Sequence, residues 1–221
     1  VDDFSENLIV EGKKKIAYFE SALQHESIDA EIRQQTFALI EKLKAEGHEV
    51  EPVEFEYLDY IIPAYYVLTT AEASSNLSRF DGVRFGHRSE EAEDLIEIYK
   101  KSRSEGFGTE VKRRVMLGAF VLSSGYYDAY YTKAQKIRRL IAEKTFEIFN
   151  DYDFILMPAS PTPPWNFGDK MDDPVEAYLA DIFTVQANMV GIPAISLPFG
   201  KHENGLPMGI QFMANKFEEK K

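Results

Sequence analysis

Three consecutive cations, residues 112–114, stand at the start of a helix that the sequence predicts from Val111 to Leu122. The first turn of a helix carries positive partial charge on its free N–H groups, so cations there are unfavourable unless a negative group compensates them. Glu105 and Glu110 are near enough in sequence to form a local salt-bridge network with them. In the alternative interpretation, one guanidinium points inward and clamps a carboxylate, for which its planar fork is well suited. Residues 115–122 are apolar or small, which favours a helix too apolar to lie on a surface.

A second ionisable group, Asp181, lies in an apolar context near the C-terminus. An N-cap, an early proline and an acid predict a helix over 173–190, on which Asp181 shares a face with Val185 and Asn188. A carboxylate that is partly buried there needs a cation or hydrogen-bond donors. Asp181 could pair with Arg114 itself. Alternatively, Asp181 holds an ammonium group while Arg114 holds a carboxylate, and together they define a site for an α-amino acid.

The remaining candidate groups favour structural roles. The four histidines have no metal-ligand spacing and no HExxH motif, so we predict no metal site and treat all four as surface residues. The glycines in 106–108 begin a dinucleotide fingerprint, but Val111 replaces the third glycine and no strand precedes them. The serine pairs at 74–75 and 123–124 lack the glycine elbow of a serine nucleophile, and small residues in helices usually permit close packing. The tyrosines within 126–131 are spaced as helical faces, which is more typical of core and rim than of a stacking platform.

The first part of the chain predicts a strand, a helix and a second strand. KKKIAYF at 13–19 is the first strand, and the helix begins at the caps Ser27 to Asp29 and ends at Gly47. Residues 48–55 alternate like a second strand. This order within about forty residues is the signature of a βαβ crossover, so at least part of the sheet should be parallel.

Helices and short strands make up the rest. Helices are predicted from about residue 64 to 76 with Pro63 in the first turn, at 90–103, at 111–122 with Thr109 as the cap, and at 132–150. Strands are predicted at 154–157, 194–200 and 206–214, the last two around the turn Asn204-Gly205. The proline-rich loop after residue 157 holds the only tryptophan. Such loops often cover sites, although a rigid connector is the commoner case.

Composition bounds the functional classes. With 221 residues, no internal repeat and no long linker, the chain is predicted to be a single α/β domain over 1–221. The net charge of -12 repels nucleic acid and anionic membranes, so any RNA partner should be bound largely elsewhere. The absence of cysteine fits a reducing compartment, and no apolar run is long enough to span a membrane, so the cytoplasm is the expected location. The first residue is Val rather than Met, which suggests a fragment or a processed chain.

Several blocks resemble the amidase signature family. They are AEASSNLSRFDGVRFGHRS, SRSEGFGTEVKRRVMLGAFVLSSGYYDAYYTKAQKIRR, NMVGIPAISLPFG and GLPMGIQFM. The likeness is collinear from about Gly12 to Phe217 and is strongest to members that hydrolyse glutamine for tRNA-dependent amidation. It implies a mixed β-sheet sandwiched between helical layers, of which this chain resembles the C-terminal half. Loss of the first half would expose a sheet edge and apolar surface.

The resemblance also implies a reaction and its partners. Such an enzyme hydrolyses glutamine with a Ser, cis-Ser and Lys triad, and the ammonia passes to a partner subunit that converts Glu-tRNA(Gln) or Asp-tRNA(Asn) to Gln-tRNA(Gln) or Asn-tRNA(Asn). The partners would be the other two subunits of such an amidotransferase complex, its B and C subunits, which would bind most of the tRNA. ATP and Mg would be used by the partner subunit, and no cofactor is expected in this chain.

Three substrate contacts carry over from the family. They are Tyr65, which covers the glutamine, Arg114, which clamps its α-carboxylate, and Asp181, which holds its α-ammonium. Tyr66 is adjacent, so the first assignment could shift by one. The Gly/Ser-rich signature with the triad is absent from the sequence, so no catalytic residue is expected here and the isolated chain should be inactive. Two other interpretations stay open: a binding or assembly module without chemistry, and part of an amidase with a different amide substrate.

Overall fold

The structure, a computed structural model, describes residues 12–165 and 180–219. The chain packs as two units: unit 1 comprises Val1–Ile62 and Arg138–Lys221, and unit 2 comprises Pro63–Ile137. Each boundary between them falls within a helix. The interpretation of the whole chain as one α/β domain stays a prediction.

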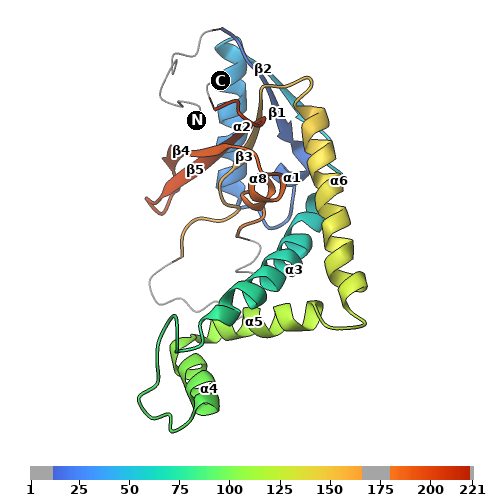
Figure 1. Ribbon diagram of the computed structural model, residues 1–221. Coiled ribbons are helices and arrows are strands. Elements are labelled where there is room, and N and C mark those ends of the chain that lie inside the picture. Colours follow the sequence, from blue (N-terminus) through green and yellow to red (C-terminus); the bar gives the residue numbers. More distant parts are fainter. Residues whose placement is uncertain (1–11, 166–179, 220–221) are drawn as a thin grey trace. The chain divides into compact units, whose positions relative to one another are not determined.

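Unit 1 is built on a five-stranded mixed sheet in the order β2-β1-β3-β5-β4 (Figure 1). The strands are β1 (Lys15–Phe19), β2 (Glu49–Val53), β3 (Phe154–Pro158), β4 (Ala194–Lys201) and β5 (Pro207–Ala214). β1 pairs in parallel with β2 and β3, whereas β5 pairs antiparallel with β3 and β4. The predicted parallel β1–β2 pair and the C-terminal hairpin are confirmed. β1 and β3 have continuous buried apolar runs, as is typical of strands covered on both faces.

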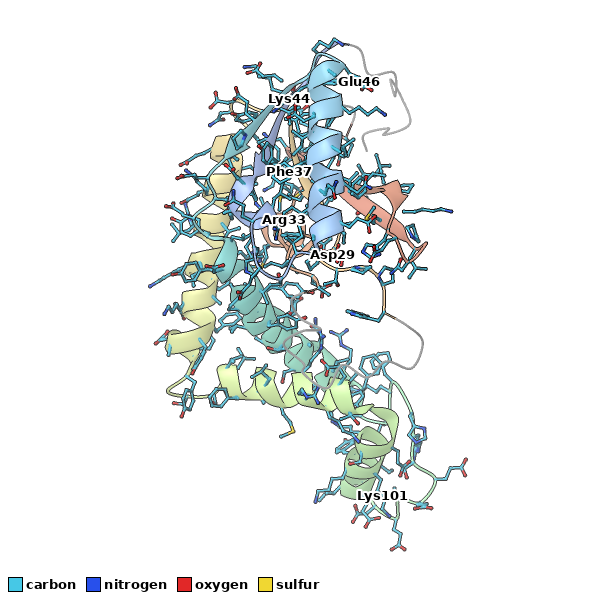
Figure 2. The ribbon with its side chains drawn as sticks, turned by 180° about the vertical axis from the view of Figure 1, so that it is seen from behind. Asp29, Arg33, Phe37, Lys44, Glu46 and Lys101 are labelled. Atoms are coloured by element: carbon cyan, nitrogen blue, oxygen red, sulfur yellow. The ribbon has the colours of Figure 1, made fainter. Side chains whose placement is uncertain are left out.

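Helices cover both faces of this sheet. α2 (Ala30–Ala45) lies on one face, where the labelled Asp29, Arg33 and Phe37 follow its length in Figure 2, and α8 (Val185–Val190) lies on the other. The short α1 (Glu20–Leu23) follows β1, and α6 (Lys133–Ile148) leads towards β3. Asp29 caps α2 as predicted, since its side chain accepts hydrogen bonds from the N–H groups of Glu31 and Ile32. The predicted mixed sheet between helical layers is confirmed.

Unit 2 is helical and is built around the crossing of two helices. Its elements are α3 (Leu58–Asn76), the 3₁₀ turn η1 (Leu77–Arg79), α4 (Leu95–Gly106), α5 (Thr109–Val121), the π-helical turn η2 (Tyr127–Thr132) and the start of α6. α3 and α5 approach closely at Gly118, where an added Cβ would lie 2.0 Å from the carbonyl oxygen of Thr70 and 2.6 Å from the Cβ of Ser74. Small residues therefore permit close packing here, as predicted for the Ser74-Ser75 pair.

Three predicted helix starts are wrong. α3 begins at Leu58 and contains Pro63, because buried apolar residues already recur every three positions upstream of the proline. α4 begins at Leu95 rather than at residue 90, because the Asp94 side chain caps it by accepting from the N–H of Glu97. The N-cap of α5 is Gly108, and Thr109 is its first helical residue.

The prediction that α5 is too apolar for a surface is wrong for this chain. Only Gly118 and Val121 of α5 are buried, and Met116 is 73% exposed. Three of the four nearby tyrosines are exposed as well, rather than in a core, and the Tyr126 ring contacts Phe120 with centroids 4.4 Å apart and planes tilted by 37°. The apolar sequence of this segment therefore does not correspond to burial within unit 2.

The prediction that every histidine is a surface residue is wrong for His202. It is 9% exposed, and its Nε2 lies 3.4 Å from Asp29 Oδ1 and 3.3 Å from Glu31 Oε2. These contacts join the β4–β5 turn to the start of α2, a pairing of distant segments that the local sequence does not indicate. Within the described part of the chain, no helix is long and apolar enough to cross a membrane.

Candidate functional site

Arg114 lies on the second turn of α5, where a carboxylate and an aromatic ring contact its guanidinium. Its Nε donates to Glu110 Oε1 at 2.9 Å, one helical turn earlier. Its Cζ lies 5.6 Å from the centroid of the Tyr66 ring, on α3. The guanidinium thus has a carboxylate at its Nε, and its central carbon lies over an aromatic ring. The side chain still keeps 37% exposure in this chain.

Glu110 is shared between two arginines. Its Oε2 accepts from Arg113 Nη1 at 2.6 Å, while Oε1 accepts from Arg114. The hydrogen bond from Arg114 is the largest cause that holds the pKa of the Glu110 carboxyl below its usual value, and the charge of Arg113 adds to it. The predicted compensation of the helix-start cations is confirmed for Glu110.

Glu105 does not take part in that network. Its carboxylate lies 2.7 Å from His87 Nε2 and accepts from Ser89 Oγ at 2.8 Å. These hydrogen bonds, the one with His87 first, hold the pKa of Glu105 below its usual value. α4 carries Glu105 to the loop that follows η1, so this carboxylate fixes the loop instead of neutralising α5.

Tyr65 and Tyr66 occupy successive positions of α3 and are both half-buried. Their rings meet edge to face, with centroids 5.2 Å apart and an interplanar angle of 83°. Tyr66 is the ring that contacts Arg114, a role the sequence did not predict. The only signal for it was adjacency to Tyr65, because the crossing of α3 and α5 is a long-range contact.

The helix crossing explains why Arg114 meets Tyr66. On α5, Gly118 follows Arg114 by one turn, and on α3, Thr70 follows Tyr66 by one turn. The Arg114–Tyr66 and Gly118–Thr70 contacts both join α3 to α5. The missing Cβ of Gly118 therefore allows the close approach of the two helices that carry Arg114 and Tyr66.

Asp181 belongs to unit 1 and differs from its prediction. It lies in the turn 180–184 that precedes α8, and its side chain is exposed rather than partly buried. Its backbone carbonyl accepts from the N–H groups of Thr184 and Val185. The predicted helix over 173–190 is described only from residue 180, and of that part only Val185–Val190 is helical; the first residues, with Tyr178, lie outside the described ranges.

The segment that carries Asp181 is anchored by buried polar contacts. The next two residues, Ile182 and Phe183, are buried, and the Phe183 carbonyl accepts from Gln211 Nε2 on β5 at 2.8 Å. Gln186, itself buried, donates to Thr145 Oγ1 on α6 at 3.0 Å. An exposed carboxylate is thus presented from a fixed backbone. The sequence gives no local signal for the roles of these glutamines, because their partners lie far along the chain.

The proline-rich loop lines a cavity in unit 1. The cavity measures about 330 Å³, and its lining includes Thr162, Trp165 and Met208. None of the three sequence-predicted contacts lies in its lining. Residues 166–179, which follow, lie outside the described ranges.

The chemistry available to these side chains is that of ion recognition. Arg114 can form two parallel hydrogen bonds with a carboxylate, and an exposed carboxylate at Asp181 can receive an ammonium group. Tyr65, Tyr66 and Arg114 belong to unit 2, and Asp181 belongs to unit 1. These two charge types are those required to bind the two charged groups of an α-amino acid.

Comparisons with known proteins give the family. The model of the family described as Amidase matches residues 1–221. A curated relative from Koribacter versatilis, named as the A subunit of glutamyl-tRNA(Gln) amidotransferase, is 54% identical over 194 residues, which is 88% of this chain and 40% of the relative. A relative of the same name from Prosthecochloris aestuarii is 53% identical over 196 residues, 89% of this chain and 41% of the relative.

Solved structures agree. The crystal structure of the A subunit of glutamyl-tRNA(Gln) amidotransferase from Thermotoga maritima has a TM-score of 0.69 and 37% identity, and the match covers 94% of this chain and 40% of that one. A structure described as an amidase, 21% identical with a TM-score of 0.72 over 96% of this chain and 44% of that one, supports the fold alone. The chain spans about two fifths of the length of the curated relatives that it matches. The resemblance drawn from the sequence blocks is confirmed.

Proposed function

The chain belongs to the amidase family, and from that premise we propose that it is the substrate-recognition part of a glutamine-dependent amidotransferase subunit. The complete subunit hydrolyses glutamine, and the ammonia converts Glu-tRNA(Gln), or Asp-tRNA(Asn), to the correctly amidated tRNA. The Ser, cis-Ser and Lys triad that performs the hydrolysis is supplied from outside these 221 residues. The B and C subunits are the partners, the complex works in the cytoplasm, and ATP and Mg act in the partner subunit.

The observation that carries the proposal is the pair of contacts that orient the Arg114 guanidinium. A guanidinium held by Glu110 at 2.9 Å and by the Tyr66 ring at 5.6 Å is oriented before any ligand arrives. Orientation in advance lowers the entropy that is lost on binding a carboxylate. Arg114 clamps the α-carboxylate of glutamine, Asp181 holds its α-ammonium, and Tyr65 covers the substrate.

The relatives support the choice of reaction. The curated relatives from two organisms, each above 50% identity over most of this chain, are both named as the A subunit of glutamyl-tRNA(Gln) amidotransferase. That name refers to Glu-tRNA(Gln) as the acceptor, so amidation of this tRNA is the first activity to test.

The test compares the isolated chain with a complete complex. The chain should release no ammonia from glutamine, because the nucleophile, its base and the oxyanion donors are all supplied by other residues. The full-length protein that contains these residues, assembled with the B and C subunits, should convert Glu-tRNA(Gln) to Gln-tRNA(Gln) with glutamine as donor. Ammonia release by the isolated chain that a mutation within it abolishes, or a complex that hydrolyses other amides and ignores glutamine, would contradict the proposal.

A further inference from the structure

We propose that Glu110 and Tyr66 are positioning residues for glutamine recognition, which they serve by fixing the guanidinium of Arg114. The inference rests on the proposed function of Arg114 and gives Glu110 and Tyr66 a positioning role that the family match and the sequence do not assign to them. Glu110 fixes the edge of the guanidinium and Tyr66 fixes its face. Neither residue needs to touch the substrate.

The edge contact determines how a carboxylate can be bound. An arginine receives a carboxylate either through Nε and one Nη or through its two Nη atoms. Glu110 engages Nε at 2.9 Å, so the side-on geometry that uses Nε is already taken by Glu110. Glu110 lies in the first turn of α5, where an acid is favourable, and its other oxygen accepts from Arg113 at 2.6 Å in an exposed pair.

The face contact adds a second constraint. The guanidinium carbon lies over the face of the Tyr66 ring, on α3, and the Gly118–Thr70 contact fixes the spacing of the two helices. A side chain with four rotatable bonds thereby loses most of its alternative orientations before glutamine binds. The consequence of losing either partner is weaker glutamine binding with unchanged chemistry.

Variants of Glu110 separate orientation from charge. Glu110→Gln keeps an oxygen that accepts from Nε and removes a negative charge near the substrate carboxylate, so KM for glutamine should stay within about twofold of wild type. Glu110→Ala removes the acceptor, so KM should rise roughly five- to twentyfold while kcat stays constant. Glu110→Asp keeps the charge and the preference for a helix start, but its shorter side chain withdraws the oxygen from Nε. It should therefore raise KM for glutamine as Glu110→Ala does, and it replaces that variant if Glu110→Ala does not assemble.

Variants of Tyr66 test the face contact in the same way. Tyr66→Phe keeps the ring and should leave KM for glutamine within about twofold of wild type. Tyr66→Leu removes the ring and should raise that KM roughly three- to tenfold. Tyr65→Phe, measured in parallel, shows whether the neighbouring tyrosine contributes through its hydroxyl. If Tyr66→Phe and Tyr66→Leu gave equal KM values, the ring would have no positioning role.

The assay uses the complete complex, with Arg114→Ala as the reference and ammonia as the alternative nitrogen donor. If Arg114→Ala leaves KM for glutamine unchanged, the proposed function of the site is wrong. If Arg114→Ala raises KM but Glu110→Ala, Glu110→Asp and Tyr66→Leu do not, only the positioning inference is overturned. Equal losses of the glutamine- and ammonia-driven reactions in these variants, with a lowered Tm, would assign the two residues a structural role instead and also overturn it.

Discussion

Arg114 became a candidate anion ligand because a cation in the first turns of a helix requires compensation, and its role as a substrate contact, carried over from the family, stays a prediction. The same reasoning named Glu110 as a compensating acid, and the structure places its carboxylate 2.9 Å from Arg114 Nε. It also named Glu105, which instead fixes a loop through His87 and Ser89. Charge patterns therefore predict that a partner exists, but the direction of each side chain depends on contacts that the local sequence does not contain.

The shared carboxylate of Glu110 gives a prediction at the scale of one residue. Both arginines favour its charged form, and Arg114 contributes the largest effect, so the pKa of Glu110 should rise towards its usual value more in Arg114→Ala than in Arg113→Ala. Titration of the side-chain carboxyl carbon by NMR measures this. Because its folded-state pKa is lowered, the stability that Glu110 contributes is present above the usual pKa and is lost as pH falls through the lowered one. A larger rise in Arg113→Ala would contradict this account of the network.

At the scale of elements, helix identities were predictable and helix ends were less so. Asp29 and Gly47 delimit α2 as predicted, because a cap and a left-handed glycine are local signals. The start of α3 was missed because Pro63 suggested a first turn, whereas Leu58 and Ile61 continue the buried stripe upstream. Burial outweighed the cost of one lost backbone hydrogen bond.

The α3–α5 crossing predicts that Gly118→Ala is strongly destabilising. The new Cβ would lie 2.0 Å from the Thr70 carbonyl oxygen, so the two helices must separate, at a cost of about 1–3 kcal/mol in the free energy of unfolding. Denaturant unfolding of the folded protein measures this cost. The matched control is Ala119→Leu, which adds a larger side chain on the exposed face of the same helix and should change stability by less than about 0.5 kcal/mol. Equal effects of the two substitutions would contradict the close crossing.

The segment that carries Asp181 depends on one buried amide. Gln211→Leu leaves the Phe183 carbonyl without its donor, so it should cost about 1–3 kcal/mol in the free energy of unfolding. Gln34→Leu, at an exposed position of α2, should stay within about 0.5 kcal/mol. In the complete complex, Gln211→Leu should also raise KM for glutamine, since Asp181 follows the movement of this backbone. An unchanged stability and KM would show that the amide does not anchor the segment.

For the whole molecule, the sequence predicted the class of fold and the family, but not the two-unit packing. The βαβ order and the hairpin turn are local patterns that determine the β1–β2 and β4–β5 pairs of the sheet order β2-β1-β3-β5-β4, whereas the pairings of β3 are long-range. Burial in this chain was less predictable: α5 is apolar in sequence yet exposes Met116, and His202 in a turn is buried. Both depend on which surfaces meet, and that information is not contained in a segment of sequence.

The charge of the whole molecule predicts that the chain alone does not bind tRNA. The net charge of -12 is concentrated in unit 1, since unit 2 contains 11 basic and 10 acidic residues. In a gel shift at low-micromolar protein and about 150 mM salt, no appreciable binding of tRNA is expected. At this salt concentration, screening weakens the attraction between tRNA and the basic residues of unit 2. A shift that survives this salt concentration would show that the chain contributes its own RNA surface.

The most direct test of the account is the KM for glutamine of a complete complex that carries Arg114→Ala. A guanidinium that forms two hydrogen bonds with a carboxylate contributes a few kcal/mol, so KM should rise roughly ten- to a thousandfold. Arg114→Lys should restore little of the glutamine binding, because lysine lacks the planar fork, and Asp181→Asn should raise KM by a comparable factor. Arg113→Ala should leave KM nearly unchanged, because Arg113 pairs with Glu110 in an exposed position. With ammonia as nitrogen donor, Arg114→Ala and Asp181→Asn should regain tRNA amidation. Equal loss of the glutamine- and ammonia-driven reactions in a folded Arg114→Ala complex would contradict the account, because Arg114 would then support structure or assembly rather than bind glutamine.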